Sequence, residues 1–238
     1  MVRNILYNGN SLFPEYDEKE EIKKIIHKKK KKEKEDFFYL NMLESIAVSG
    51  YYQMPILKPY NGEIPTRLVP FNVAYANKDY DCAVHFFIAD KHFLRVFLNP
   101  TKYLPFLKKC KAVIAPDLSQ YSNMHYAMRI YHSYCNRAIA ALWQANGVNV
   151  IPNVTWSLPD SYNYSFQGIP ENSIIAINCN GIKCCDLSKY LWYSGYKEAL
   201  KRLHPRHILR YGVRMQDERE DLSSYFINER LNKLRNGR

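Results

Sequence analysis

The feature that most constrains the fold is a recurrence of short apolar runs, rich in β-branched and aromatic residues, each of which closes on polar residues. Six such runs follow Leu68, at residues 71–75, 83–90, 112–117, 148–153, 173–178 and 207–212. Near-continuous apolar runs are typical of strands buried on both faces, as in parallel sheets. Stretches with helical periodicity separate several of them, which favours βα units.

These runs predict an α/β domain with a mostly parallel sheet of about six strands. The sheet is either open or closes as a small or incomplete barrel. Fewer than eight βα units are visible, which argues against a complete (β/α)8 barrel.

The clearest helix is expected between residues 122 and 146, with Ser122 as N-cap and Gly147 as the stop. Its apolar stripe is expected to face the core and consists of Met124, Ala127, Met128, Tyr131, Cys135, Ala138 and Leu142. A second helix is expected over residues 188–203, ending before Pro205.

The chain of 238 residues is long enough for one main domain with appendages. We expect a charged N-terminal appendage over residues 1–36, helical or disordered, and a connecting helix and loops over residues 37–66. The α/β core follows over residues 67–215. Residues 216–238 are expected to form a charged C-terminal helix or tail.

The formal net charge of +11 favours polyanionic partners such as nucleic acid. The lysine run at residues 28–32 does not carry this excess, because residues 15–36 hold nine lysines against eight acids. Residues 189–214 hold seven basic residues and one acid, which makes them the better candidate for a phosphate-facing surface. The candidate nucleic-acid-binding residues are Arg129, Arg137, Lys197, Lys201, Arg202, Arg206, Arg210 and Arg214. The alternative is a solvated surface without a partner.

Ligands of parallel α/β folds bind outside the carboxyl ends of the strands, where the loops converge. Asp117 follows a predicted strand directly and is the candidate catalytic acid or base, with Ser119 beside it. Its alternative role is to cap the next helix or to close a turn with Ser119. The candidate substrate-binding residues are Asn153, Trp156, Asn178 and Tyr211. If these hypotheses hold, the six side chains should converge on one pocket.

A zinc site built from Cys179, Cys184 and Cys185 with His204 and His207 matches no standard ligand spacing, and no metal or other cofactor is expected. His125 and His132 share a helix face, but two histidines alone do not indicate a metal site. Phosphate-binding glycine loops and hydrolase or metalloprotease motifs are absent from the sequence. No apolar run approaches membrane-spanning length and six cysteines follow no secreted pattern, so we expect a cytoplasmic protein with reduced thiols and no membrane partner.

Four segments resemble a known family. They are residues 115–119 (APDLS) before the long helix, 150–156 (VIPNVTW), 166–170 (FQGIP) and 207–212 (HILRYG). Over residues 68–215 the chain resembles the domain-of-unknown-function family numbered 4417, which occurs in bacteria, archaea and phages. The resemblance implies no established activity. Its occurrence in phages and mobile elements implies, by association, a nucleic-acid context.

Three functional hypotheses remain open. The first is a nucleic-acid-associated protein of a phage or mobile element, supported by charge and by abundant aromatic residues. The second is an enzyme that acts on a small polar or nucleotide-like substrate, with Asp117 as acid or base. The third is an interaction module, such as an inhibitor of a host factor, which would show an aromatic surface patch and no concave site.

Overall fold

A computed structural model describes residues 6–7, 10–11, 43, 45–180, 182, 185–212, 215 and 219–226. The chain divides into two compact units, residues 1–41 and 42–238. Within the first unit the described residues form two short antiparallel strands, β1 (Leu6–Tyr7) and β2 (Asn10–Ser11). The lysine-rich segment at residues 15–36 lies outside the described residues. All other described helices and strands belong to the second unit.

Seven parallel strands form the framework of the described part of the second unit. A short antiparallel pair, β3 (Val48–Ser49) and β4 (Met54–Pro55), precedes them. A four-stranded parallel sheet has the order β5 (Leu68–Pro70), β6 (Ala83–His85), β7 (Ala112–Ile114) and β8 (Val150–Ile151). A three-stranded parallel sheet consists of β9 (Ile174–Cys179), β10 (His207–Gly212) and β11 (Ser223–Phe226).

The two sheets meet between β8 and β9. Ala176 of β9 donates its N–H to the carbonyl of Pro152 (2.8 Å) and accepts from the N–H of Val154 (2.9 Å). Asn153 and Ala176 therefore form a parallel bridge. The seven strands run side by side in the order in which they occur in the chain, so each connection leads to the neighbouring strand.

This continuous sheet is strongly curved. The ring centroids of His85 on β6 and Tyr211 on β10 are 4.3 Å apart, although β7, β8 and β9 lie between their strands. Side chains from β6 to β10 share one apolar cluster on the inner face, and Leu68 of β5 and Phe226 of β11 pack against it. No pairing of β5 with β11 closes the sheet among the described strands. The predicted α/β class with a parallel sheet is confirmed, and the sheet is an incomplete barrel.

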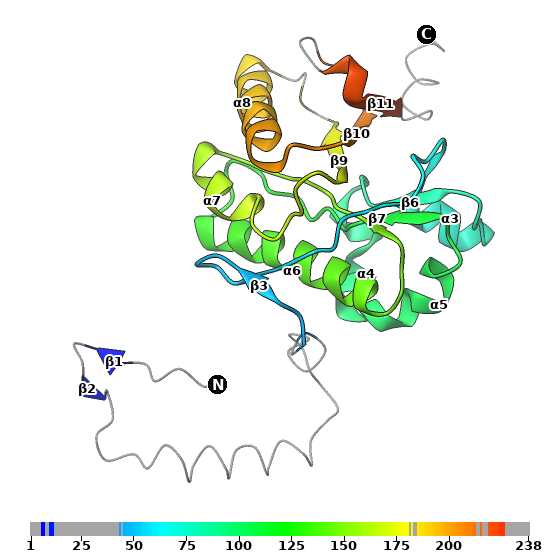
Figure 1. Cartoon of the computed structure of the whole chain (residues 1–238), viewed down its shortest axis with the longest axis horizontal. Helices are drawn as coiled ribbons and strands as arrows, with labels where there is room; N and C mark the ends of the chain where they lie inside the picture. The colour runs from blue at the N-terminus through cyan, green and yellow to red at the C-terminus, as the bar shows by residue number, and fades with distance from the viewer. Residues whose placement is uncertain are drawn as a thin grey trace. The chain divides into compact units, whose positions relative to one another are not determined.

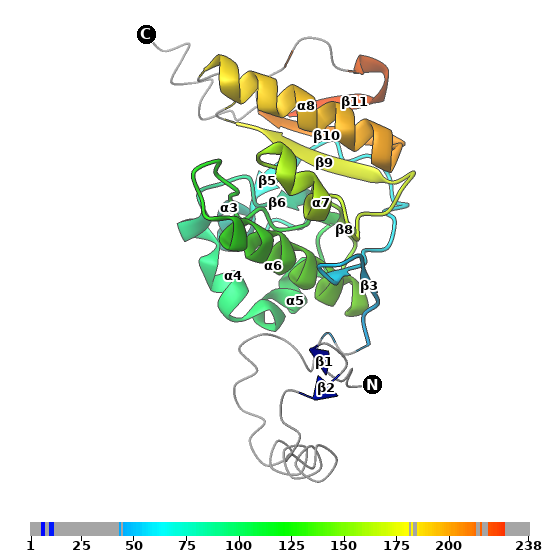
Figure 2. The same cartoon turned by 90° about the vertical axis from the view of Figure 1, so that its left-hand side faces the viewer.

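The helices cover the outer face in two groups (Figures 1 and 2). The first group packs on β5 to β8 and comprises α3 (Phe71–Asn77), α4 (Leu94–Leu98), α5 (Leu104–Leu107) and α6 (Tyr126–Ala145). On β9 and β10 lies α8 (Asp186–Leu203), and α7 (Tyr162–Ser165) lies in the β8–β9 connection. Four 3-10 turns complete the described elements: η1 (Asp90–His92), η2 (Pro100–Tyr103), η3 (Pro159–Ser161) and η5 (Glu220–Leu222).

The first predicted strand, residues 71–75, is wrong, because these residues form helix α3. The strand is β5, directly before it. Pro70 ends β5 and precedes the helix, as expected for a residue without an N–H to donate. Phe71 and Ala74, three residues apart, are both buried, which is helical spacing. The sheet also extends to β11, beyond the boundary that we expected at residue 215.

The long helix starts later than predicted, and only the C-terminal half of the expected apolar stripe is buried. Its N-cap is His125 rather than Ser122, whereas Gly147 does end it, with φ +81°. Of the expected apolar stripe, Met128 and Tyr131 are exposed, whereas Cys135, Ala138 and Leu142 are buried. The polar residues Arg129 and Asn136, outside that stripe, are also buried. Arg129 donates to Asp160, and Asn136 makes hydrogen bonds with the backbone of Leu118.

In the described part of the chain, no helix is long and apolar enough to cross a bilayer. The five cysteines described there are Cys82, Cys110, Cys135, Cys179 and Cys185, and the first four are buried. Only Cys185 is exposed.

Candidate functional site

A pocket of about 450 Å³ opens at the carboxyl ends of β7, β8 and β9. The loop after β7 supplies Asp117 and Ser119, the segment after β8 supplies Thr155 and Trp156, and β9 supplies Asn178. The first half of α8 closes one side. This is the edge of a parallel sheet at which ligand sites form, because successive loops converge there.

Asp117 is the hydrogen-bonding centre of the pocket. Its Oδ1 accepts from Nδ2 of Asn153 (2.8 Å) and from the hydroxyl of Thr155, and its Oδ2 accepts from Nδ2 of Asn178 (3.2 Å). Asn153 also donates to Oγ1 of Thr155 (3.1 Å), which ties the two donors together. Donors from the ends of two further strands therefore hold one carboxyl group in place.

The environment of Asp117 acts on its proton affinity in two directions. The side chain is buried, and burial raises the pKa of Asp117 above its ordinary value because it penalises the charged form. The hydrogen bonds from Thr155, Asn153 and Asn178 lower this pKa, and the neighbouring carboxylate of Asp90 raises it slightly. Burial is the largest cause, so the carboxyl takes up a proton more readily than an exposed aspartate does.

Ser119 is held by a second carboxylate. Its hydroxyl donates to Oδ1 of Asp90 (3.0 Å), and its N–H lies 3.4 Å from both oxygens of that carboxylate. His132 of α6 donates from Nδ1 to the Ser119 carbonyl (2.6 Å). Because the histidine reaches the carbonyl rather than Oγ, this arrangement positions the loop and does not form a serine–histidine nucleophile pair.

An aromatic wall faces these polar groups. Trp156 is half-buried, and its Nε1 donates to the carbonyl of Leu191 on α8 (3.3 Å). Its ring centroid lies 6.1 Å from that of Trp192. Gly195 of α8 lies directly against the Trp156 indole. The pocket therefore combines a polar floor with indole surface, a combination that suits a ligand with a flat apolar face.

Comparison of the sequence with known proteins identifies the family of the chain. The sequence model described as "Domain of unknown function (DUF4417)" matches residues 46–229, which include all seven strands of the parallel sheet and the pocket. The chain belongs to this family. Neither its description nor the names of the relatives below state an activity.

Two phage proteins are similar to the chain. The Gene 1 protein of Mycobacterium phage D29 is 33% identical over 184 residues, which are 74% of this chain and 66% of that protein. The Gene 1 protein of Mycobacterium phage L5 is 32% identical over 180 residues, 74% of this chain and 78% of that protein. The chain thus spans just under two thirds of the D29 protein. No solved structure matches the chain.

Five of the six side chains that were expected at one pocket are together in this family member. Asp117, Ser119, Trp156 and Asn178 line it, and Asn153 lies behind Asp117 as a hydrogen-bond donor. Tyr211 does not reach it. Its ring packs in the inner cluster against His85 and Phe87. Tyr211 pairs in register with Asn178, which does line the pocket, so its place on the next strand and its contacts with His85 and Phe87 account for the difference.

Helix α8 contributes a side of the pocket that the sequence did not indicate. Ser188, Leu191 and Trp192 line it together with Gln120 and Tyr121 from the loop before α6. The signal available in the sequence was positional, because α8 follows the carboxyl end of β9 and therefore begins at the same edge of the sheet. Asp117 does not cap α6, whose N-cap is His125.

Three of the candidate nucleic-acid-binding arginines are buried. Arg129 makes a two-bonded ion pair with Asp160 (2.8 and 2.9 Å). Arg137 donates to the Ser165 carbonyl (2.9 Å), and burial lowers its pKa to about 9. Arg210 stacks under Trp192 at 4.3 Å and donates to Sγ of Cys179 (3.1 Å). None of the three presents its guanidinium to solvent, so we correct this part of the expectation.

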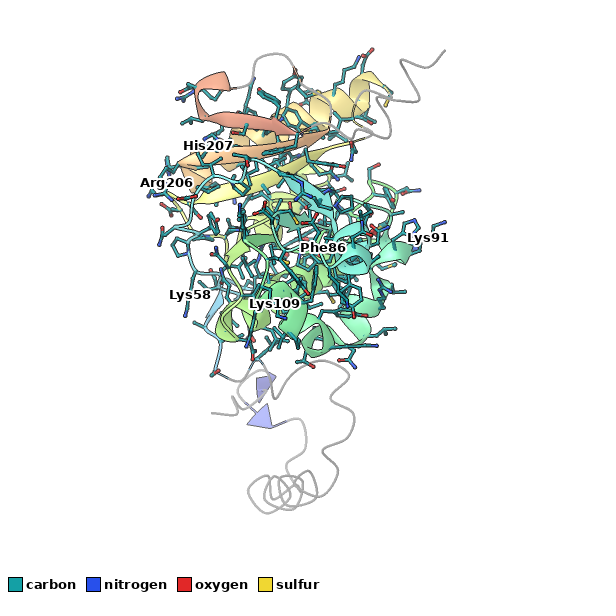
Figure 3. All side chains as sticks on the ribbon, turned by 90° about the vertical axis from the view of Figure 1, so that its right-hand side faces the viewer. Lys58, Phe86, Lys91, Lys109, Arg206 and His207 are labelled. Carbon is teal, nitrogen blue, oxygen red and sulfur yellow. The ribbon has the colours of Figure 1, made fainter. Side chains whose placement is uncertain are left out.

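The remaining candidates that the structure describes are exposed, namely Lys197, Lys201, Arg202 and Arg206. Arg202 is engaged with Glu198 (2.6 Å) and Arg206 donates to the Tyr60 carbonyl (3.2 Å). Arg214 lies outside the described residues. Figure 3 shows Arg206 far from the exposed Lys91 and Lys109, so basic side chains are spread over the surface.

No group of three or more potential metal ligands occurs within the part of the chain that the structure describes. Cys184, one of the residues considered for zinc, is outside it. His204 is exposed beside Glu171 (3.8 Å), and His207 bonds Ser224 across the β10–β11 pair (2.8 Å). His125 caps α6 and His132 bonds the Ser119 backbone.

Proposed function

We propose that the domain binds a small polar molecule in the strand-end pocket and acts on it with Asp117 as acid or base. One observation carries the proposal: hydrogen-bonding side chains from the ends of β8 and β9 converge on a single buried carboxyl that faces a pocket of about 450 Å³. That volume lies within the range of small-molecule sites, roughly 300–1,000 Å³.

The environment of Asp117 suits proton transfer. Burial raises the pKa of Asp117 toward the working range of a general acid or base, whose efficiency is greatest when its pKa lies near the ambient pH. The donors Thr155, Asn153 and Asn178 stabilise the carboxylate when the proton leaves. The same side chain can therefore hold a proton and release it without large movement.

The test is a ligand screen of the full chain against mixtures of small polar metabolites by ligand-observed NMR. Asp117→Asn keeps the shape of the side chain and removes its ionisation. Asp81→Asn makes the same change at an exposed carboxylate that pairs with Lys111. We expect ligands that bind the wild type and Asp81→Asn but lose at least tenfold in affinity with Asp117→Asn, and whose conversion stops in that variant. Equal binding and conversion by all three proteins would contradict the proposal.

A second proposed function is association with nucleic acid. It is favoured by the net charge of +11 and by the exposed basic residues on and after α8. The burial of Arg129, Arg137 and Arg210 reduces the surface that is available for phosphate. Lys197 and Lys201, one helical turn apart on α8, are the residues on which this function rests.

Fluorescence anisotropy with single- and double-stranded oligonucleotides at two salt concentrations tests it. The Lys197→Glu/Lys201→Glu variant should lose affinity and show a shallower salt dependence. Lys58→Glu/Lys109→Glu is the matched control, since both residues are exposed elsewhere on the domain (Figure 3). An equal loss of affinity in both double variants would show that the oligonucleotide is attracted by net charge alone. Absence of measurable affinity in the wild type would rule the function out.

A further inference from the structure

We propose that the ligand of the strand-end pocket is a flat nitrogen heterocycle of the nucleobase or nucleoside class, read through a neighbouring donor and acceptor on its ring edge. The inference rests on the function proposed above, because it names the ligand of the same pocket. It is carried by the hydrogen-bonding capacity that remains on Asp117 and Asn178, by the indole wall and by the charge of the lining.

The first step is the capacity of Asp117. An ionised carboxylate offers about four lone-pair sites, two on each oxygen. Oδ1 already accepts from Asn153 and Thr155, whereas Oδ2 accepts from Asn178 alone. Within the described residues, one acceptor site on Oδ2 is left for a ligand.

The second step is the capacity of Asn178. Its amide nitrogen has two hydrogens, and one of them is donated to Asp117 Oδ2. Its Oδ1 accepts from the N–H of Asn180 (2.9 Å), which fixes which end of the amide faces Asp117. The other hydrogen on Nδ2 has no partner among the described residues. A donor and an acceptor therefore remain side by side, on atoms that are 3.2 Å apart.

A ligand that satisfies both must offer an acceptor next to a donor. The lactam edge of uracil, hypoxanthine or guanine does so with a ring N–H beside a carbonyl, and the amidine edge of adenine or cytosine does so with an amino group beside a ring nitrogen. Asparagine and aspartate read bases by such pairs elsewhere, through paired hydrogen bonds to adenine and acceptance from the cytosine amino group.

The third step is the wall. Trp156 lines the pocket and is held by Leu191 and Gly195, so its indole is a fixed surface rather than a side chain that swings. Trp192 lies next to it. Stacking of a base on an aromatic side chain is worth about 1–3 kcal/mol and requires a flat ligand. A fixed wall supplies it without ordering cost on binding.

The fourth step is charge. The described residues that line the pocket include Asp117 and no lysine, arginine or histidine. Asp90 adds a second carboxylate behind Ser119. Among these described residues a phosphate group would meet negative charge and no cation, which disfavours binding. The pocket should therefore prefer a base or nucleoside to the corresponding monophosphate.

The experiment is isothermal titration of the full chain with bases, nucleosides and nucleoside monophosphates. The matched ligand control is the same base methylated on the ring nitrogen of that edge, which keeps the ring. The methyl group replaces the N–H of a lactam edge and blocks the ring acceptor of an amidine edge. We expect at least one base or nucleoside to bind, with at least tenfold weaker binding of its monophosphate and of its edge-methylated form. Asn178→Ala should cause a similar loss, while Asp81→Asn should not.

Three results would overturn the inference. They are equal affinity for the methylated base, tighter binding of the monophosphate, and no binding of any base or nucleoside. The function proposed above survives them if non-aromatic amides or amines bind in a manner that Asp117→Asn abolishes. The proposed function itself is contradicted if Asp117→Asn leaves the binding of every ligand unchanged.

Discussion

Trp156 lies against Gly195 of α8 so closely that a methyl group on Gly195 would overlap Nε1 of the indole. The same Nε1 donates to the Leu191 carbonyl one turn earlier in the helix. A single glycine in the middle of α8 therefore determines where the aromatic wall of the pocket stands.

We expect Gly195→Ala to destabilise the domain, although glycine to alanine in a helix normally stabilises by about 0.5–1 kcal/mol. The overlap with Trp156 forces a shift of the kind that costs about 1–3 kcal/mol. Urea denaturation followed by circular dichroism measures the change. Ser194→Ala, at the neighbouring helical position, should not destabilise. If Gly195→Ala raises the unfolding free energy as a free helix position would, the contact does not hold the indole.

Asp117→Asn should change the dependence of stability on pH. The folded-state pKa of Asp117 is raised, so between its unfolded and folded pKa values the folded protein binds more protons than the unfolded chain. The contribution of Asp117 to stability then falls as pH rises through this interval. The free energy of unfolding of Asp117→Asn, relative to wild type, should increase from acid to neutral pH. Asp81→Asn serves as the control, and a pH-independent difference would refute the prediction.

His85 should contribute a slope of the opposite sign. Burial lowers its pKa to about 3, and its Nδ1 accepts from the Phe87 N–H, so the neutral ring carries its proton on Nε2. Its stability contribution is present above the unfolded pKa of about 6.5 and is lost as pH falls toward 3, by about 1.4 kcal/mol per pH unit.

Replacing His85 by phenylalanine removes this titration, so the variant should lose less stability than wild type between neutral and acid pH. Chemical denaturation at several pH values measures the difference. His92→Phe, at an exposed histidine, is the comparison. An unchanged acid slope in His85→Phe would show that the ring is protonated in the folded protein.

Arg210→Ala should lower the stability of the domain, because Arg210 is a core residue and not part of a binding surface. The guanidinium lies 4.3 Å from the Trp192 ring and 4.9 Å from the Tyr196 ring, and it is 1% exposed. Its loss leaves a cavity under α8, and we expect a cost of about 2–5 kcal/mol, as for other large core truncations. Lys201→Ala, on the exposed face of the same helix, should change stability by less than about 0.5 kcal/mol. Thermal unfolding of both variants separates the two roles.

The polar residues at the carboxyl ends of the strands could be predicted, because each one directly follows or ends an apolar run in the sequence. An apolar run followed by Asp117, Asn153 or Asn178 places a polar side chain at one edge of a parallel sheet, and the topology brings such edges together. Tyr211 follows the same pattern and still points elsewhere. Tyr211 pairs in register with Asn178, but it lies on the next strand of the curved sheet, where His85 and Phe87 pack against its ring. The curvature that brings these distant residues together is not visible in the pattern of a single run.

The prediction that Arg129, Arg137 and Arg210 are exposed to a nucleic acid was wrong for a related reason. The sequence shows that Arg129, Arg137 and Arg210 are charged, but it does not show which groups they contact. In the folded domain their partners are, in that order, Asp160, the Ser165 carbonyl and the Trp192 ring. These partners are 28 to 31 residues away in the chain for the first two, so no local pattern reveals them. The burial of Arg129 and Asn136 on α6 has the same origin, because their hydrogen-bond partners are distant in the chain. Cys135, Ala138 and Leu142 of the expected apolar stripe are buried as well.

The strands lie in the sheet in the order in which they are synthesised. Each strand that leaves the ribosome can add to the edge formed just before it, so the sheet can grow during translation without waiting for a distant partner. The last described residue that lines the pocket is Trp192 of α8, whereas β10 and β11 follow later in the chain. A nascent chain that has released α8 therefore already contains every described residue of the pocket. The described residues of β10 then pack against that helix through Ile208.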